Sequence, residues 1–435
     1  MTDSRFMNDF RRRGRTWLIA IALMAPAIAS AELEIAGFGT LGGAVSDQDL
    51  DYLGNISQDG TLNQDSVIGF QLDGRFTPAW SLTIQAKAAP SDHRENGWDP
   101  KLTWAFVSWR PTNDLLLRVG KLRVPLMFYS ANSDVGITYP FARLPVEVYS
   151  VFPVTDVVGA AFSWSWLSGE SDWTLEGYGG HTHTDWRFYL RDGIPPLSSA
   201  GPLYVGVDAD MAGLVLTLRR RENAFAVGLH LVEASANSGP FPSDYPYVSI
   251  APGVGYYQTL PNLPGPGIPT VDILKVDVLT LSLQIALPKD LKLIGEYAHR
   301  RMENATIGIE THAAYLGLLR TIDKWTPYVY VAGIRSDDDL LDLYESMNGT
   351  RVPDSVPFAS LINASQRLGA DQLLPYDQTT VALGTSYQVT PSSTLKAEWA
   401  HTRSGVASSF MDAPTDEDSG DRAVNVFSLS YNLTF

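Results

Sequence analysis

The 435-residue sequence lacks cysteine, has few charged residues and, after its first 31 positions, contains no long apolar run. The absence of cysteine excludes disulfides, thiolate metal sites and a cysteine nucleophile. Charged residues make up 18% of the chain, below the roughly 25% that is typical of soluble domains. Because a membrane-spanning helix needs about 20 apolar residues, helical spans are excluded beyond the N-terminal segment.

The N-terminal segment has the three parts of a secretory signal peptide. Four arginines between positions 11 and 15 precede an apolar core from Trp17 to Met24, and Ala29-Ser30-Ala31 supplies a cleavage site. We therefore expect residues 1–31 to be removed. They carry five arginines and two aspartates, so their removal changes the net charge from −16 to −19. Such an acidic protein repels the phosphates of nucleic acids, and we expect no nucleic-acid partner.

From residue 32 onward, apolar and polar residues alternate in a series of short segments. One segment alternates Leu279, Leu281, Leu283 and Ile285 with Thr280, Ser282 and Gln284. This period of two is typical of membrane-spanning β-strands, because one face of each strand meets lipid and the other meets the lumen.

The connections between these segments alternate in length. Short turns lie near residues 77–80, 111–114, 168–172, 220–223, 288–290, 322–324 and 390–393. Longer loops lie near residues 47–64, 91–99, 125–156, 184–207, 234–271, 303–308, 336–377 and 405–421. This alternation predicts an all-β fold, a transmembrane antiparallel up-and-down β-barrel of about sixteen strands over residues 32–435. A soluble β-sandwich or barrel is the alternative, but it gives no reason for connections to be sorted by length.

The last segment ends the chain on an aromatic residue. One of its faces carries Phe427, Leu429, Tyr431, Leu433 and Phe435. Such a strand resembles the closing strand of bacterial outer-membrane proteins, and the resemblance implies that these residues are the signal read by the barrel-assembly machinery. We expect the segment that begins at Leu33 to pair with it, because a barrel in lipid leaves no strand edge unpaired.

The third long loop, residues 125–156, follows a run that contains Arg118, Gly120 and Lys121. This order is similar to that of Gram-negative trimeric porins, in which the third external loop folds into the barrel. The resemblance implies a homotrimer in the outer membrane of a Gram-negative bacterium, in contact with lipid and lipopolysaccharide, that passes small hydrophilic solutes. The Pro-Glu-Phe-Gly-Gly motif of enterobacterial general porins is absent, and Pro140 to Glu147 (PFARLPVE) stands in its place.

A pore filter needs opposite charges that face each other across a narrow aqueous gap, because their field discriminates between solutes by charge and dipole. The candidates for an acidic wall on the loop are Asp134, Glu147 and Asp156. The candidates for the basic side are Arg75, Lys87, Lys121, Arg123 and Arg143. The alternative is that the acidic residues hold the loop to the barrel wall by hydrogen bonds.

Motifs of enzymes and cofactor sites are missing from the sequence. It contains no G-x-S-x-G, no H-E-x-x-H and no P-loop. His181 and His183 stand two apart without a third ligand nearby, so we expect no metal site and no cofactor. We predict a non-enzymatic channel for passive diffusion of ions and small hydrophilic solutes. Two alternatives stay open, a substrate-selective porin for an anion or acidic metabolite and a barrel that serves as a surface adhesin or receptor.

Overall fold

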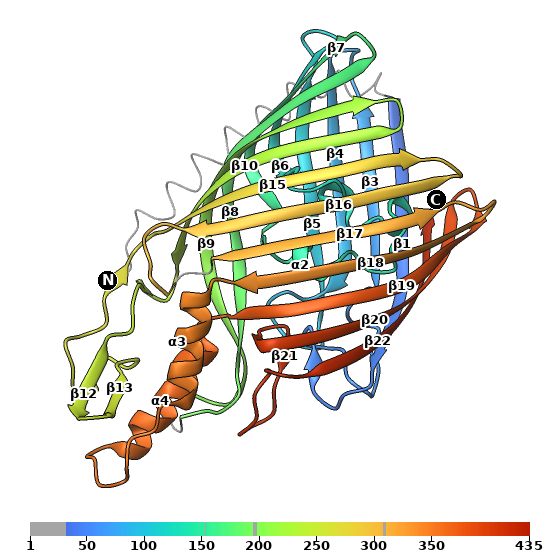
Figure 1. The fold of residues 1–435 in the computed structure, drawn as a ribbon. Helices are drawn as coiled ribbons and strands as arrows, with labels where there is room; N and C mark the ends of the chain where they lie inside the picture. The colour runs from blue at the N-terminus through green and yellow to red at the C-terminus, as the bar shows by residue number, and fades with distance from the viewer. Residues whose placement is uncertain (1–31, 153, 195–197, 308–309) are drawn as a thin grey trace, which may run out of the picture.

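The computed structural model describes residues 32–152, 154–194, 198–307 and 310–435, so the predicted signal peptide lies outside the described residues. Sixteen antiparallel strands form one closed barrel (Figure 1), which confirms the predicted fold. The barrel strands are β1 (Glu32–Ser46), β3 (Val67–Arg75), β4 (Trp80–Pro90), β5 (Trp98–Trp109), β6 (Leu115–Arg123), β7 (Asp156–Ser168), β8 (Ser171–Leu190), β9 (Gly201–Arg220), β10 (Asn223–Ala236), β15 (Leu274–Leu287), β16 (Leu291–Met302), β17 (Thr311–Arg320), β18 (Trp325–Ser336), β19 (Tyr376–Thr390), β20 (Ser393–Ser408) and β22 (Ala423–Thr434). Among the residues described, no helix is long and apolar enough to cross a membrane.

Alternation along each strand sorts the side chains between the two faces of the wall. In β17 every second residue is buried, including Ala313 and Tyr315, and the residues between them are exposed. The exposed set includes Leu316 and Leu318, at 53% and 38% of their area. Because large apolar side chains at exposed positions form the outer surface of such a barrel, the buried set faces inward.

The first and last strands close the barrel, as predicted. Their register runs from Phe38 opposite Thr434 to Ser46 opposite Val426. The predicted C-terminal residues lie on the outer face, where Phe427 and Leu429 are more than half exposed. A methyl group added at Gly37 would lie 2.3 Å from the ring of Phe435, so glycine is required for the C-terminal ring to pack there. The role of this strand in assembly stays a prediction.

The seven short turns lie where they were predicted, and the longer connections fall at the opposite ends of the strands. One loop was predicted too long, because residues 184–207 are mostly strand. β8 continues to Leu190 and β9 begins at Gly201, so each strand has 20 residues. That is about twice the length needed to cross a bilayer, and the extra residues raise the wall on the loop side.

The long loops contain secondary structure that the alternation did not predict. α3 (Asp338–Gly349) and α4 (Ala359–Asp371) precede β19, and the hairpin of β12 (Tyr247–Ala251) and β13 (Val254–Tyr257) precedes β15 (Figure 1). The two loops pack together, since the side-chain amide of Gln366 accepts from and donates to the backbone of Tyr257 at 2.8 Å. Two further pairs of short strands in the loops are β2 (Asp51–Tyr52) with β21 (Met411–Asp412) and β11 (Phe241–Pro242) with β14 (Thr270–Val271).

Arg191, one residue beyond β8, joins three of these loops. Its Nε lies 2.5 Å from Oδ1 of Asp371 at the end of α4, and its Nη2 donates to Asn348 on α3 at 3.1 Å. Its Nη1 donates to the carbonyl of Glu417 at 3.3 Å. Because Arg191 is 4% exposed, this contact set is buried inside the loop assembly.

Candidate functional site

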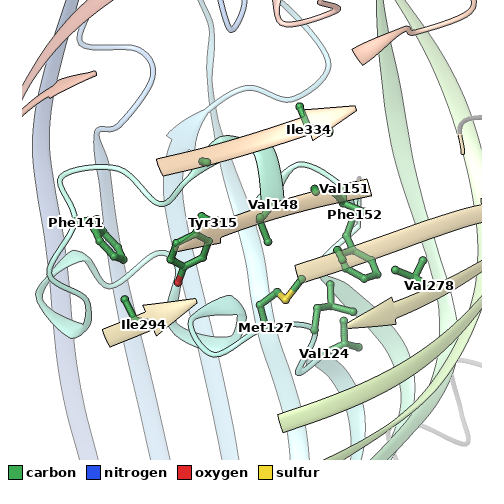
Figure 2. Close-up of a cluster of buried hydrophobic side chains, with 14 of the residues drawn as sticks. Val124, Met127, Phe141, Val148, Val151, Phe152, Val278, Ile294, Tyr315 and Ile334 are labelled. Atoms are coloured by element: carbon green, nitrogen blue, oxygen red, sulfur yellow. The ribbon is translucent and has the colours of Figure 1, made fainter. Parts of the chain in front are cut away.

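The segment between β6 and β7 is the third long loop, and it contains two short 3-10 helices, η1 (Ser130–Asn132) and η2 (Gly136–Thr138), and one turn of helix, α2 (Val146–Tyr149). Its apolar side chains pack against inward-facing residues of the wall, as Figure 2 shows. The loop contributes Val124, Leu126, Met127, Phe141, Val148, Val151, Phe152 and Val154, and the wall contributes Ile294, Ala298, Ala313, Tyr315, Tyr328, Tyr330, Ala332 and Ile334, among others. The loop therefore contacts the inner face of β16, β17 and β18.

Phe141 is fully buried at the centre of this contact. Its ring meets those of Tyr315, Tyr328 and Tyr330 edge-on, with centroids 5.9, 5.1 and 5.4 Å away. Edge-to-face aromatic pairs of this kind each add stability beyond their buried area. The backbone is fixed as well, because the N–H of Ala142 donates to the Tyr328 hydroxyl at 2.8 Å.

A single lysine on the wall holds the loop by its backbone. Nζ of Lys396, on β20, donates to the carbonyl oxygens of Gly136, Tyr139 and Phe141 at 2.5, 2.7 and 2.8 Å. An ammonium has three donors, and all three are used here. The same group lies 4.0 Å from the centroid of the Tyr139 ring, a cation–π contact.

Two glutamates complete the attachment. Glu147, on α2, accepts from Gln378 at 2.8 Å and from the Thr380 hydroxyl, both on β19. Glu296, on β16, accepts from the backbone N–H of Phe128 at 2.7 Å and from the Tyr149 hydroxyl at 2.6 Å. Glu147 was predicted to form part of an acidic filter wall, and its contacts instead match the alternative in which the acid holds the loop to the wall.

Asp134 joins the loop to the opposite side of the barrel. It lies 2.6 Å from Nζ of Lys87 on β4 and 2.8 Å from Nη1 of Arg123 at the end of β6. Burial opposes ionisation of Asp134, but the two cations outweigh it and lower the pKa of this carboxyl below its usual value. Three of the predicted filter residues are therefore in direct contact.

Arg143 forms a second ion pair, with a residue that was not predicted. Its Nε and Nη2 lie 2.9 and 2.5 Å from the two carboxylate oxygens of Asp65, which precedes β3. This is the bidentate geometry that guanidinium and carboxylate groups prefer. Asp65 lies in a polar loop sequence, and no pattern there distinguished it from its neighbours.

The other predicted filter residues lie elsewhere. Arg75 is 71% exposed beside a short turn, 3.7 Å from Glu32. Lys121 pairs with Asp156 at 2.8 Å, and the residue opposite Lys121 in the register is Val158, which is 61% exposed. Residues opposite each other in the register share a face, so Lys121 lies with Val158 on the outer side of the wall. Asp156 precedes Val158 by two residues on β7 and therefore lies on the same side. The sequence Leu115–Arg123 does not alternate cleanly, and the face of Lys121 therefore did not follow from the pattern.

A polar cavity of about 530 Å³ lies between the third loop and residues 53–66 and 91–95 of the first two long loops, with the ends of β1, β3, β4, β8 and β9 also contributing to its lining. Its charged lining residues are Asp65, Lys87, Asp92, Glu95, Asp134, Arg143 and Arg187, and its neutral polar ones include Thr40, Asn55, Asn63, Gln64, Ser66, Ser91, Ser133, Tyr139 and Tyr204. The predicted filter had opposite charges separated by an aqueous gap. In the structure, the opposite charges in this lining touch.

The histidine pair on the outer face contacts acids of the neighbouring strand. His181 lies 3.1 Å from Asp210, and His183 lies 2.9 Å from Asp208. Within the described residues, no group of three or more histidine or carboxylate side chains is placed to hold a metal ion.

No family model and no curated protein matches this sequence. Solved structures match over nearly its full length. The anion-selective porin from Comamonas acidovorans superposes with a TM-score of 0.51 and 10% identity, over 93% of this chain and 100% of that chain. The chain has the fold of outer-membrane porins. A second solved structure, the in-vitro folded outer membrane protein OmpT of Vibrio cholerae in its trimer form, matches with a TM-score of 0.50 and 10% identity, over 93% of this chain and 99% of that chain. At this identity the likeness concerns the fold alone.

Proposed function

We propose that this protein is an outer-membrane channel through which ions and small hydrophilic solutes diffuse passively. The observation that carries the proposal is the placement of the third loop. It packs against the inner face of β16, β17 and β18, and its Asp134 and Arg143 reach Lys87, Arg123 and Asp65 on the other side of the sixteen-strand barrel, where a polar cavity lies. A barrel of this size encloses a water-filled lumen unless something fills it, and we take the polar cavity beside the loop as its open part.

The outer surface supports a membrane location. Large apolar side chains are exposed on strand after strand, from Ile35 on β1 to Phe427 on β22. Exposed apolar faces of this extent are costly in water and are expected where lipid surrounds the wall. With the predicted signal peptide and closing strand, this points to the outer membrane of a Gram-negative bacterium, with lipid, lipopolysaccharide and the barrel-assembly machinery as partners. A homotrimer is part of the proposal and follows from the resemblance to porins.

The third loop is the proposed constriction. A loop that narrows a pore must resist displacement by the solutes that pass it, and this one is fixed at several points. Lys396 holds its backbone, Glu147 and Glu296 hold it to β19 and β16, and Phe141 packs into the wall. We infer that Asp134, Lys87 and Arg143 border the open part of the lumen, with Arg123 buried beside Asp134.

Planar lipid bilayers test the proposal. The mature protein, refolded and inserted, should give stepwise conductance in KCl, in groups of three steps for a trimer. The control is the same protein denatured and added without refolding. Folded protein that inserts without conductance would refute the channel, and the adhesin or receptor alternative would then lead. A strong anion preference of the reversal potential would support the substrate-selective alternative.

A further inference from the structure

We propose that the channel favours neutral polyhydroxylated solutes, of the size of a monosaccharide or disaccharide, over ions of the same size. The inference rests on the proposed channel function and names the solute class of the cavity between the third loop and the first two long loops. It follows from three properties of the lining, namely its charge compensation, its neutral hydrogen-bonding groups and its volume.

The first property is charge compensation. Every charged side chain of the lining contacts an opposite charge. Asp65 pairs with Arg143, and Asp134 pairs with Lys87 and Arg123. The two remaining acids are paired as well. Asp92 lies 2.7 Å from Lys101, and Glu95 lies 2.8 Å from Arg187, which also contacts Asp412. With the partners included, the five acids Asp65, Asp92, Glu95, Asp134 and Asp412 face the five cations Lys87, Lys101, Arg123, Arg143 and Arg187. An ion that enters this space meets no uncompensated partner to replace the water that it loses.

The ion pairs of the lining are also held in place, so a passing ion cannot easily separate them. Asp65 with Arg143 and Asp134 with Lys87 have side chains 15% exposed or less. Breaking one of these pairs to bind a passing ion would leave a half-buried charge without its partner, at a considerable cost in free energy. Their outer oxygen lone pairs can still accept hydrogen bonds from hydroxyl groups, which carry no net charge.

The second property is the neutral lining. Side-chain amides and hydroxyls both donate and accept, as do the hydroxyl groups of a sugar. Asn55, Asn63 and Gln64 supply amides, and serine, threonine and tyrosine side chains supply hydroxyls.

The third property is size. The cavity volume of about 530 Å³ lies within the roughly 300–1,000 Å³ typical of small-molecule sites. Most such sites are lined by apolar side chains, whereas this lining is dominated by polar ones. An apolar solute would leave these groups unpaired, and an ion would find them already neutralised. A neutral molecule rich in hydroxyl groups is the class that satisfies them.

Proteoliposome swelling tests the proposal with three probes that share one carbon skeleton. They are neutral glucose, anionic gluconate and cationic glucosamine. We expect glucose to enter about fivefold faster than either ion, since each ion meets an uncompensated electrostatic cost. Entry of gluconate or glucosamine at the rate of glucose would overturn the inference. Conductance in KCl is measured on the same preparation, so that failure of the channel itself is seen separately from failure of the solute preference.

Substitutions test whether this cavity sets the preference. Asp65→Asn leaves Arg143 without its partner and should raise the entry of gluconate relative to glucose about fivefold. The double variant Asp65→Asn with Arg143→Gln restores neutrality and should restore the preference for glucose, which separates charge balance from loop damage. Glu170→Gln removes one negative charge at an exposed turn, where it contacts Arg220 and Arg221, and should change nothing. If Glu170→Gln shifts the preference as much as Asp65→Asn, net charge and not the cavity sets it, and the inference fails.

Discussion

Nζ of Lys396 lies 2.8 Å from the carbonyl oxygen of Phe141, although the two residues are 255 positions apart in the chain. This contact places the centre of the third loop against β20. We predict that Lys396→Met frees the loop, because three buried carbonyl oxygens lose their donor together. The loss should lower the free energy of unfolding by at least ~2 kcal/mol and increase the noise of the open-channel current.

Both effects are measured with one control. Lys292, on β16, is exposed, and Lys292→Met should leave unfolding and current noise as in the unsubstituted protein. A Lys396→Met channel with unchanged noise and stability would show that the apolar contacts alone hold the loop.

Phe141 tests those apolar contacts. Phe141→Ala removes the ring from the space between three tyrosines, and we expect it to lower the free energy of unfolding by ~3–5 kcal/mol. Phe141→Leu keeps most of the volume and should cost less than half as much. Chemical denaturation of the folded barrel measures both. Phe358→Ala is the control, because Phe358 is 66% exposed and should change stability by less than ~1 kcal/mol. Equal losses for Phe141→Ala and Phe358→Ala would contradict the packing role.

The barrel fold could be predicted from the sequence, because the two faces of the wall impose a period of two on the strands. Lys396 illustrates the limit of that reasoning. It stands between Leu395 and Ala397 at an inward position of β20, so the alternation was sufficient to place it in the lumen. Nothing in the alternation indicates which groups fill the lumen opposite, and its three carbonyl partners belong to a segment without periodicity.

The charge pairs could be predicted in part, because alternation shows which face of the wall a strand residue occupies. Lys87 lies in a segment that alternates cleanly and contacts Asp134 of the third loop, whereas Lys121 lies in a run that does not alternate and is on the outer face. The partner of Arg143 comes from another loop, and pairing between loops depends on how both are folded. The helices α3 and α4 were missed because the region was read only as a polar connection.

The external loops give a separate prediction about Arg191. Arg191→Gln leaves Asp371 buried without its cation, and removing one partner of a buried pair costs about 3–5 kcal/mol locally. We expect limited proteolysis to cut the loops around α3 and α4 faster, while the KCl conductance steps of the barrel remain. The double variant Arg191→Gln with Asp371→Asn removes both charges and should recover part of the protease resistance. Unchanged cleavage in the single variant would mean that the apolar contacts between the loops suffice.

The last prediction concerns how low pH affects the contact between Asp134 and β4. The pKa of Asp134 in the folded protein is lowered, because Lys87 and Arg123 favour its charged form more than burial opposes it. A carboxyl whose folded pKa is lowered contributes stability above its unfolded pKa of about 3.9, and that contribution is lost as the pH falls through the folded pKa. The contact between the loop and β4 should therefore persist from pH 7 to pH 4 and weaken only below that range. Asp134→Asn should raise the noise at pH 7. The difference in current noise between the Asp134→Asn channel and the unsubstituted channel isolates this contact, and it should stay flat to pH 4 and then fall. A fall in this difference between pH 7 and pH 5 would show that another group controls the loop.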